Sequence, residues 1–153
     1  MYESIKYIIN YLKTNNYKTK LILETPAGVG TELLTKVEDF IEFYNKFTLN
    51  EKKNFKICLD TAHIWSSGYE LNDYQKKIKS INEAIYIIHF NNSKVKKGSN
   101  VDRHEYIHSG LIKKEDLEQF LKFIKTSPVI ILEKPITNYS DEIEWIRKNF
   151  IEK

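Results

Sequence analysis

The sequence predicts an α/β fold in which four parallel strands carry flanking helices, in the order α-(βα)4. Short apolar runs alternate with longer segments of helical period, and this alternation is typical of parallel sheets with right-handed crossovers. The runs are almost continuously apolar, as expected for strands covered on both faces. The chain has 153 residues, the size of one ordinary domain. We therefore expect a single domain over residues 1–153.

The first elements follow from apolar spacing and turn residues. A helix is expected over 3–14, with its apolar side chains at helical spacing: Ile5, Ile8, Ile9 and Leu12. The run "LILETP" at 21–26 predicts a buried strand closed by Pro26, and "AGVG" then predicts a tight loop. Thr31 is the expected N-cap of a helix over about 32–47. The inward face of this helix would consist of Leu33, Leu34, Val37, Phe40, Ile41 and Tyr44.

The later elements repeat the same alternation. Strands are expected over 55–60, 84–90 and 128–133. Helices are expected over 71–83, 114–125 and 139–150, and a polar loop over 91–113. Two architectures accommodate this order: an open doubly wound sheet, or half of an eight-stranded (βα)8 barrel, which normally needs about 250 residues.

Composition narrows the class of protein. The apolar content is 41% and the charged content 29%, values typical of globular proteins, and no apolar run approaches the ~20 residues that span a bilayer. We expect no membrane partner. Cys58 is the only cysteine, which excludes an internal disulfide and favours a reducing, cytoplasmic or intracellular location. The net charge of +3 is compatible with nucleic-acid binding but does not argue for it.

Each predicted strand ends on a residue of metal-ligand type. The four endings are Glu24, Asp60, His89 and Glu133. Because the carboxyl ends of parallel strands lie on one face, these side chains are expected to converge. A single carboxylate at a strand end is usually a cap or turn residue, but four such endings together favour a site. Three carboxylates near an imidazole would repel one another unless a cation lay among them.

Three more candidates lie close in the sequence. His63 follows Asp60 by one helical turn, and "VDRH" places Asp102 and His104 on the same side of an extended stretch. Imidazoles with carboxylates and no thiolate suit Zn²⁺, Mn²⁺ or Fe²⁺, and we interpret Cys58 as core packing. Seven ligands exceed the needs of one ion, so two or three ions are expected. A multi-metal cluster of this kind is typical of phosphoester hydrolysis.

Four segments resemble a known family. The segments "LILETPAGVGTEL", "ICLDTAHIWSSGYEL", "IHFNNSKVKKGSNVDRHEYI" and "VIILEKP" are similar in order to endonuclease IV, the metal-dependent apurinic/apyrimidinic endonuclease. The resemblance implies the C-terminal half of a TIM (β/α)8 barrel that binds up to three Zn²⁺, with Mn²⁺ as an alternative. It implies hydrolysis of the DNA backbone 5′ to abasic sites in base excision repair.

The resemblance also assigns roles to individual residues. Glu24 would bridge two ions and would complete one metal site together with Asp60, His89 and Glu133. His63, Asp102 and His104 would hold a second ion. The attacking hydroxide would lie near Glu24 and Glu133, the catalytic carboxylates. Lys94 and Arg103 would contact phosphates of double-stranded DNA containing an abasic site.

The sequence departs from the family pattern in three places. Two further histidine ligands precede the part of the family that this chain matches, so the third ion site is not represented. The family's "NDSK" is "NNSK" here, with Asn92, and its "HIGEG" is "YIHSG". We therefore expect the chain to work with an N-terminal half-barrel chain or to self-associate. The alternatives are a sugar isomerase or epimerase on the same barrel, and an inactive truncated remnant that binds metal or DNA.

Overall fold

Four parallel strands form the centre of the molecule, as predicted. The computed structural model describes residues 1–124, 126, 128–134 and 139–151. The strands lie in the order β1-β2-β3-β6, and all three neighbouring pairs are parallel. Their bounds are Leu21–Glu24 for β1, Phe55–Asp60 for β2, Ile85–His89 for β3 and Val129–Ile131 for β6.

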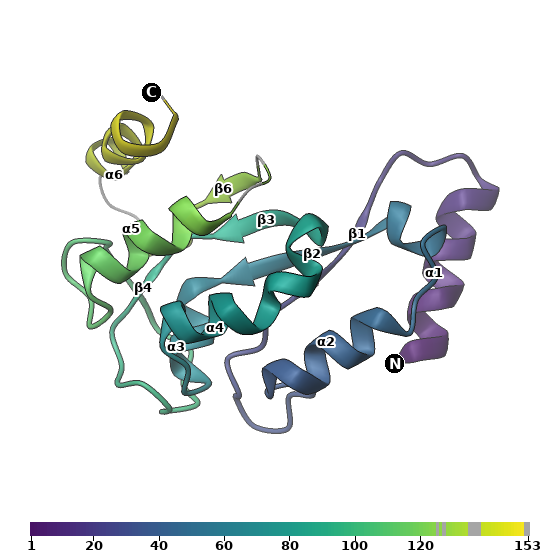
Figure 1. Ribbon diagram of the computed structural model, residues 1–153, viewed down its shortest axis with the longest axis horizontal. Coiled ribbons are helices and arrows are strands. Elements are labelled where there is room, and N and C mark those ends of the chain that lie inside the picture. Colours follow the sequence, from purple (N-terminus) through teal and green to yellow (C-terminus); the bar gives the residue numbers. More distant parts are fainter. Residues whose placement is uncertain (125, 127, 135–138, 152–153) are drawn as a thin grey trace.

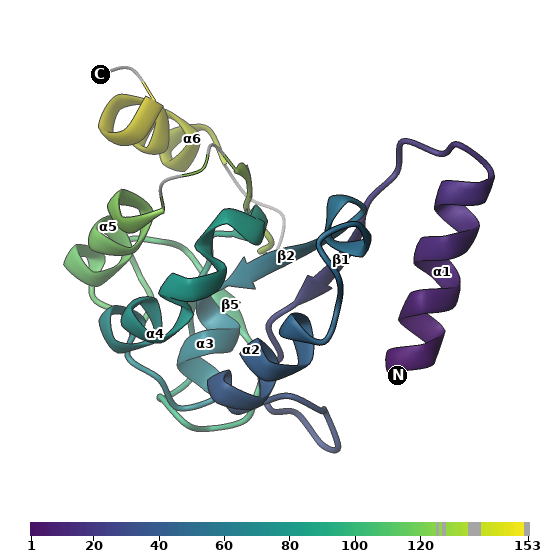
Figure 2. The ribbon, with the colours of Figure 1, turned by 45° about the vertical axis from the view of Figure 1, so that its right-hand side comes forward.

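Helices cover one side of this sheet and extend beyond its two ends. In Figure 1, α3, α4 and α5 lie along the sheet, whereas α1 and α6 stand at opposite ends of the molecule. Figure 2 shows α2 beside α3 on the same side. The helices are α1 (Tyr2–Thr14), α2 (Val37–Asn45), α3 (Thr61–Ser66), α4 (Leu71–Ile78), α5 (Lys114–Phe123) and α6 (Ser140–Ile146). Among the described residues, none of these helices has the length and apolar character that crossing a membrane requires.

Short helical turns flank the longer elements. Glu51–Lys53 and Lys79–Ala84 are 3₁₀ turns, and Arg147–Ile151 is a π turn that continues α6. The helix expected over 71–83 therefore changes its winding after Ile78. The strand expected over 128–133 is shorter, and Glu133 follows β6 by two residues. Lys125, at the expected end of the fifth helix, lies outside the described residues.

The predicted start of the second helix is wrong. The helix begins at Val37 after Lys36, and Thr31 does not cap it. The carboxylate of Glu32 instead accepts hydrogen bonds from the backbone N–H groups of Gly28 (2.8 Å) and Val29 (3.0 Å). These bonds hold a compact loop where the sequence pattern indicated a first helical turn. Leu34 also adopts a positive φ of 64°, which a helix does not accommodate.

Two features of the structure were not expected from the sequence. Helix α3 follows β2 without a loop, because the Asp60 carboxylate caps it by accepting from the His63 N–H at 2.8 Å. The predicted loop over 91–113 contains an antiparallel ribbon of β4 (Asn92–Ser93) and β5 (His104–Glu105). Helix α3 and the β4–β5 ribbon both place side chains at the carboxyl ends of the four parallel strands.

The core lies between the sheet and the helices. Phe55, Ile57 and Leu59 alternate along β2 with no exposed surface, and Ile88 of β3 is equally buried. Val129 is 55% exposed, and none of the described residues pairs with the outer edge of β6. The sheet therefore has a closed side under the helices and two open edges, at β1 and β6.

Candidate metal centre

The carboxyl ends of the four strands bring four ligand-type side chains together. His89 Nδ1 lies 2.8 Å from Glu24 Oε1 and 2.8 Å from Glu133 Oε2. Asp60 pairs in register with His89 on the neighbouring strand, and its Oδ2 lies 3.8 Å from His89 Nδ1. We call these four residues, Glu24, Asp60, His89 and Glu133, the four-residue cluster. Each offers one ligand atom, and the four atoms all lie within 4.8 Å of one another.

A second group overlaps the first through Asp60. Helix α3 presents His63 and strand β5 presents His104, and together with Asp60 they offer ligand atoms within 4.8 Å of one another. Asp102 lies against both rings: its carboxylate oxygens are 3.0 Å from His104 Nε2 and 3.3 Å from His63 Nε2. Glu24 Oε1 also approaches His63 Nδ1, at 3.5 Å. The structure thus adds Asp60 to the group for which the resemblance gave His63, Asp102 and His104.

The hydrogen bonds of the two imidazoles fix which ring nitrogen faces the group. His63 Nδ1 lies 2.9 Å from the carbonyl oxygen of Thr25, and His104 Nδ1 lies 2.5 Å from that of Glu133. A carbonyl oxygen only accepts, so each Nδ1 carries a proton and each Nε2 of a neutral ring presents a lone pair. Both Nε2 atoms are buried and lack a hydrogen-bond partner among the described residues.

This arrangement fits metal ions. His104 Nε2 lies 3.0 Å from an Asp102 oxygen. A neutral imidazole there would direct its lone pair at the carboxylate, and a cation between them would relieve the repulsion. His89 Nδ1 faces two carboxylate oxygens at 2.8 Å but can donate only one hydrogen. Three imidazoles and four carboxylates form a donor set suited to Zn²⁺ or Mn²⁺.

Burial and nearby charges shift the pKa values of two of these groups. Burial raises the pKa of the Glu24 carboxyl, and the nearby His89 and His63 offset this only in part. Burial acts to lower the pKa of His63, but Asp60, the Thr25 carbonyl and Asp102 outweigh it, and the pKa is raised. Both groups therefore hold protons more readily than usual, and a bound cation would displace them.

The two predicted DNA contacts lie on the ribbon that carries His104. The Lys94 N–H donates to the Arg103 carbonyl at 2.9 Å, which extends the β4–β5 pairing by one step. Lys94 is 60% exposed in its side chain, and its Nζ lies 3.4 Å from Glu105 Oε2. Arg103 is exposed and donates through Nη1 to the Asp102 carbonyl at 2.6 Å. Both side chains therefore border the metal-ligand groups without entering them.

Cys58 lies closer to the site than the sequence indicated. It is 3% exposed, and its sulfur falls within 4.8 Å of ligand atoms of Glu24 and His89. Burial, with the Glu24 charge, raises the pKa of the Cys58 thiol far above its usual range. The thiol is therefore neutral at physiological pH in the absence of a cation, and its burial agrees with its interpretation as core packing.

We expect Cys58 to be inert towards thiol reagents in the folded chain, because a buried neutral thiol offers little thiolate. The measurement is the rate of reaction with dithionitrobenzoate at pH 8, with and without denaturant. Reaction should be fast only in denaturant. Rapid labelling of the native chain at the rate of the denatured one would contradict this placement of Cys58.

Comparisons with known proteins show which family and fold the chain resembles. A family model described as "xylose isomerase-like TIM barrel" matches residues 1–149. The "Probable endonuclease 4" of Metamycoplasma arthritidis is 37% identical over 160 residues, which cover 94% of this chain and 56% of the relative. The crystal structure of endonuclease IV from Thermus thermophilus superposes with a TM-score of 0.69 at 23% identity, covering 97% of this chain and 57% of that one.

A sugar-converting enzyme has the same fold. The structure of 3-keto-D-glucoside 4-epimerase from E. coli superposes with a TM-score of 0.61 at 15% identity, covering 96% of this chain and 52% of that one. At such identities the structural matches establish the fold alone. They confirm that the four parallel strands and their helices form part of a TIM barrel. The chain spans just over half the length of the relative from Metamycoplasma arthritidis.

The likeness to "Probable endonuclease 4" confirms the resemblance found in the sequence motifs. It extends over nearly the whole chain, including the segments that carry the two ligand groups. The chain therefore belongs to the family of xylose isomerase-like TIM barrels, and the curated relatives that it matches there are probable endonucleases 4.

Proposed function

We propose that the chain is the metal-binding half of a zinc-dependent hydrolase that cuts the DNA backbone 5′ to abasic sites, in base excision repair. The observation that carries the proposal is the convergence of seven ligand-type side chains in two groups that share Asp60. Such a donor set exceeds what one ion needs, and paired ions are suited to phosphoester hydrolysis. An intracellular location belongs to the proposal, because the substrate is cellular DNA.

The proposal gives each ligand a place. One ion would be held by the four-residue cluster, and a second by Asp60 with His63, Asp102 and His104. When bound, such ions polarise a phosphate and lower the pKa of water. Zn²⁺ suits the donors best, and Mn²⁺ is the alternative. A third ion would need ligands from the remainder of a complete barrel.

Two carboxylates are the proposed catalytic residues. Glu24 and Glu133 flank His89 at equal distances of 2.8 Å, and both are partly exposed, so they can reach substrate. A carboxylate in this position can accept a proton from attacking water. Glu133 would orient the same water from the opposite side.

Double-stranded DNA with an abasic site is the proposed partner. Lys94 and Arg103 extend from the β4–β5 ribbon next to His104, where each could contact a backbone phosphate. Lys94 would exchange its pairing with Glu105 for a phosphate oxygen. These contacts would orient the duplex without reading its bases.

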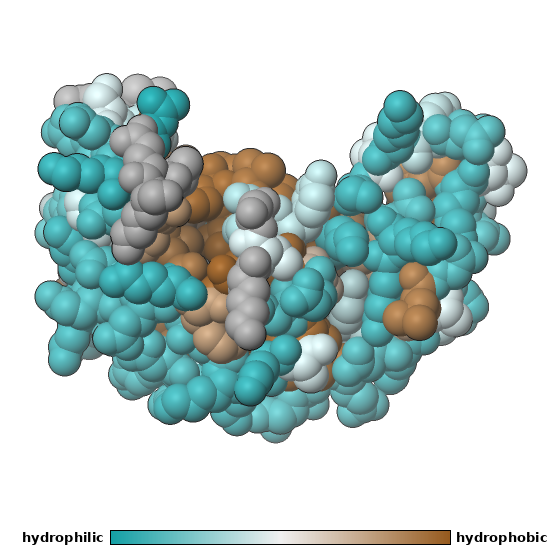
Figure 3. All heavy atoms as spheres, turned by 45° about the horizontal axis from the view of Figure 1, so that its top comes forward, coloured by the Kyte–Doolittle hydropathy of each residue, from teal (hydrophilic) through white to brown (hydrophobic). Residues whose placement is uncertain are grey.

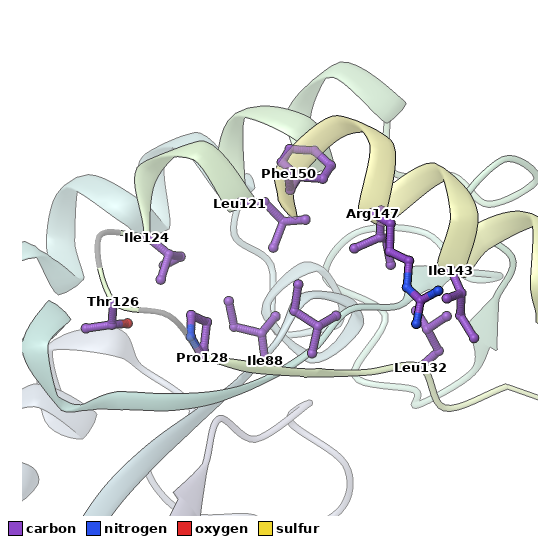
Figure 4. Close-up of a pocket in the computed structure, with 11 residues that line it drawn as sticks. Ile88, Leu121, Ile124, Thr126, Pro128, Leu132, Ile143, Arg147 and Phe150 are labelled. Carbon is purple, nitrogen blue, oxygen red and sulfur yellow. The ribbon is translucent and has the colours of Figure 1, made fainter. Parts of the chain in front are cut away.

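A complementary half-barrel is the second proposed partner. Figure 3 shows apolar side chains in a hollow between the α6 end and the α1 end of the molecule. Part of this hollow is an apolar cavity of about 550 Å³ beside the open edge of β6. Figure 4 shows its lining by Ile88, Leu121, Leu132 and Ile143, with Phe150 above. A parallel strand added to β6 would place alternate side chains in this cavity.

The remainder of the matched barrel is the proposed occupant of this hollow. The chain covers 57% of the Thermus thermophilus enzyme, and barrels have no open strand edges. The remaining part of such a barrel would therefore pair with β1 and β6. It would also be the source of the ligands that a third ion needs.

We expect the isolated chain to self-associate, because open strand edges and an exposed apolar cavity favour association. Sedimentation velocity over a range of concentrations measures this. Ile143→Glu should weaken association, because Ile143 lines the cavity and is 42% exposed. Leu49→Glu is the control, because Leu49 is 86% exposed and does not line that cavity. A monodisperse monomer at all concentrations would contradict the expectation.

A second candidate function is sugar isomerisation or epimerisation. The E. coli epimerase has the same fold, and the four-residue cluster alone could hold the single ion that such chemistry needs. The presence of His63, Asp102 and His104 beside it favours the nuclease, since these side chains would have no role in the isomerase. A catalytically inactive, metal- or DNA-binding remnant is the third candidate.

Cleavage of a defined duplex tests the proposal. The chain would be combined with zinc and the separately expressed remainder of the Metamycoplasma arthritidis relative, then incubated with a duplex carrying one abasic site. We expect a cut on the 5′ side that leaves a 3′-hydroxyl, and loss of cutting with Glu24→Gln or Glu133→Gln. Turnover of ketoses without DNA cleavage would support the epimerase candidate, and zinc binding without either activity would support the remnant.

A further inference from the structure

Asn91 lies between the strand ends that carry the proposed metal ligands, although it is not itself one of them. It follows β3 by two residues and is 2% exposed. Its side-chain amide connects two separate elements. Nδ2 donates to Asp60 Oδ2 at 2.8 Å, and Oδ1 accepts from the Glu133 N–H at 2.7 Å.

The chemistry of its partners fixes the orientation of this amide. The Glu133 N–H can only donate and the Asp60 carboxylate can only accept, so reversing the amide would lose both bonds. The backbone of Asn91 is held as well. Its N–H donates to Thr61 Oγ1 at 2.9 Å, and the Thr61 hydroxyl lies 2.5 Å from the Asn91 carbonyl oxygen. Asn91 is therefore a rigid link between β2 and the segment that follows β6.

The link determines where the shared carboxylate points. Asp60 Oδ1 accepts from the His63 N–H, so Asn91 binds the other oxygen. That oxygen, Oδ2, is the one that lies 3.8 Å from His89 Nδ1 and 3.6 Å from His104 Nε2. Asn91 thus binds the oxygen of Asp60 that faces both ligand groups.

We propose that Asn91 is a positioning residue of the metal centre. It holds the Asp60 carboxylate and the Glu133 backbone at a fixed separation, so that Asp60 serves both ligand groups and Glu133 serves the first. The inference rests on the proposed metal-dependent function. Hydrogen-bond partners of metal ligands commonly change metal affinity by about 10- to 100-fold when they are removed.

The neighbouring Asn92 is a matched control. It is 1% exposed, and its amide makes four hydrogen bonds, to the backbone of Ser93, Ile107 and Ile112. None of these bonds reaches a ligand side chain. Asn92→Ala therefore removes a buried amide of the same kind, one that bonds the backbone of β4 and of the loop over 107–112.

The experiment compares zinc affinity and the visible absorption of bound Co²⁺ in the wild type, Asn91→Ala and Asn92→Ala. We expect about 10- to 100-fold weaker zinc binding and a changed Co²⁺ spectrum for Asn91→Ala. Asn92→Ala should lose thermal stability but keep the affinity and the spectrum of the wild type. If Asn91→Ala does not fold, Asn91→Ser, which keeps a polar group, replaces it in this comparison.

Each outcome separates the inference from the function on which it rests. A wild-type chain that binds no zinc overturns both. A wild type that binds zinc, with Asn91→Ala binding equally well and giving the same spectrum, overturns the positioning role alone. Equal losses of affinity in Asn91→Ala and Asn92→Ala also overturn it, because the effect would then be a general consequence of removing a buried amide.

Discussion

Replacing Asp60 with asparagine is expected to remove both ions from the site and to abolish DNA cleavage. Asp60 has no exposed surface, and it is the residue shared by the two ligand groups. The carboxamide keeps the shape of the side chain but offers a neutral oxygen, so zinc affinity should fall on the order of 100-fold or more. Zinc content per chain, measured by elemental analysis after gel filtration, checks this prediction.

The metal-free Asp60→Asn variant should fold, but less stably than the metal-free wild type. The substitution removes a buried charge, but if the oxygen of the new carboxamide keeps the bond from the His63 N–H, its Nδ2 faces the Asn91 amide donor. A buried donor without a partner costs about 1–3 kcal/mol. Asp116→Asn is a matched control, since Asp116 is a carboxylate of α5 that accepts from Asn72 at 2.9 Å and belongs to neither ligand group. Full zinc content in Asp60→Asn, or its loss in Asp116→Asn, would show that the shared-carboxylate arrangement is wrong.

Removing bound zinc with a chelator is expected to lower the thermal midpoint by roughly 10 °C. An ion that binds only the folded state adds about 4 kcal/mol when its free concentration is about 1,000 times Kd. For a chain of this size each kcal/mol shifts Tm by about 2–4 °C. Without the ion, four carboxylates and three imidazoles face one another without a cation. Scanning calorimetry with and without EDTA measures the shift.

The chelator effect has an internal control. In Asp60→Asn, which should hold no zinc, EDTA should leave the midpoint unchanged. Restoring zinc to the wild type should restore its midpoint. Equal midpoints for the wild type with and without EDTA would mean that the ligand groups hold no ion that contributes to folding.

The sequence predicted that ligand-type side chains converge, because the carboxyl ends of parallel strands lie on one face of the sheet. Glu24, Asp60 and His89 close three apolar runs, and the parallel register places Asp60 beside His89. His63 was expected one helical turn after Asp60, and α3 places it there. The placement of Asp102 against His63 and His104 agrees with the same-side expectation for "VDRH". Local spacing predicted where each residue lies on its own element, and the fold brings these elements together.

The features that the sequence could not predict depend on contacts between distant segments. The start of α2 was misplaced because Glu32 turns back to the loop at Gly28, a tertiary choice that propensity does not show. Asp60 caps α3 and also belongs to both ligand groups. Only the capping role can be recognised from the neighbouring residues in the sequence. Asn91 has none, since its contacts join residues 31 and 42 positions away.

Diffraction at the zinc absorption edge tests the central claim most directly, namely that two ions share Asp60. Crystals of the chain grown with zinc would give an anomalous difference map. The account predicts two peaks on either side of the Asp60 carboxylate, one beside Glu24, His89 and Glu133 and the other beside His63, Asp102 and His104. A single peak, or peaks that do not adjoin Asp60, would contradict it.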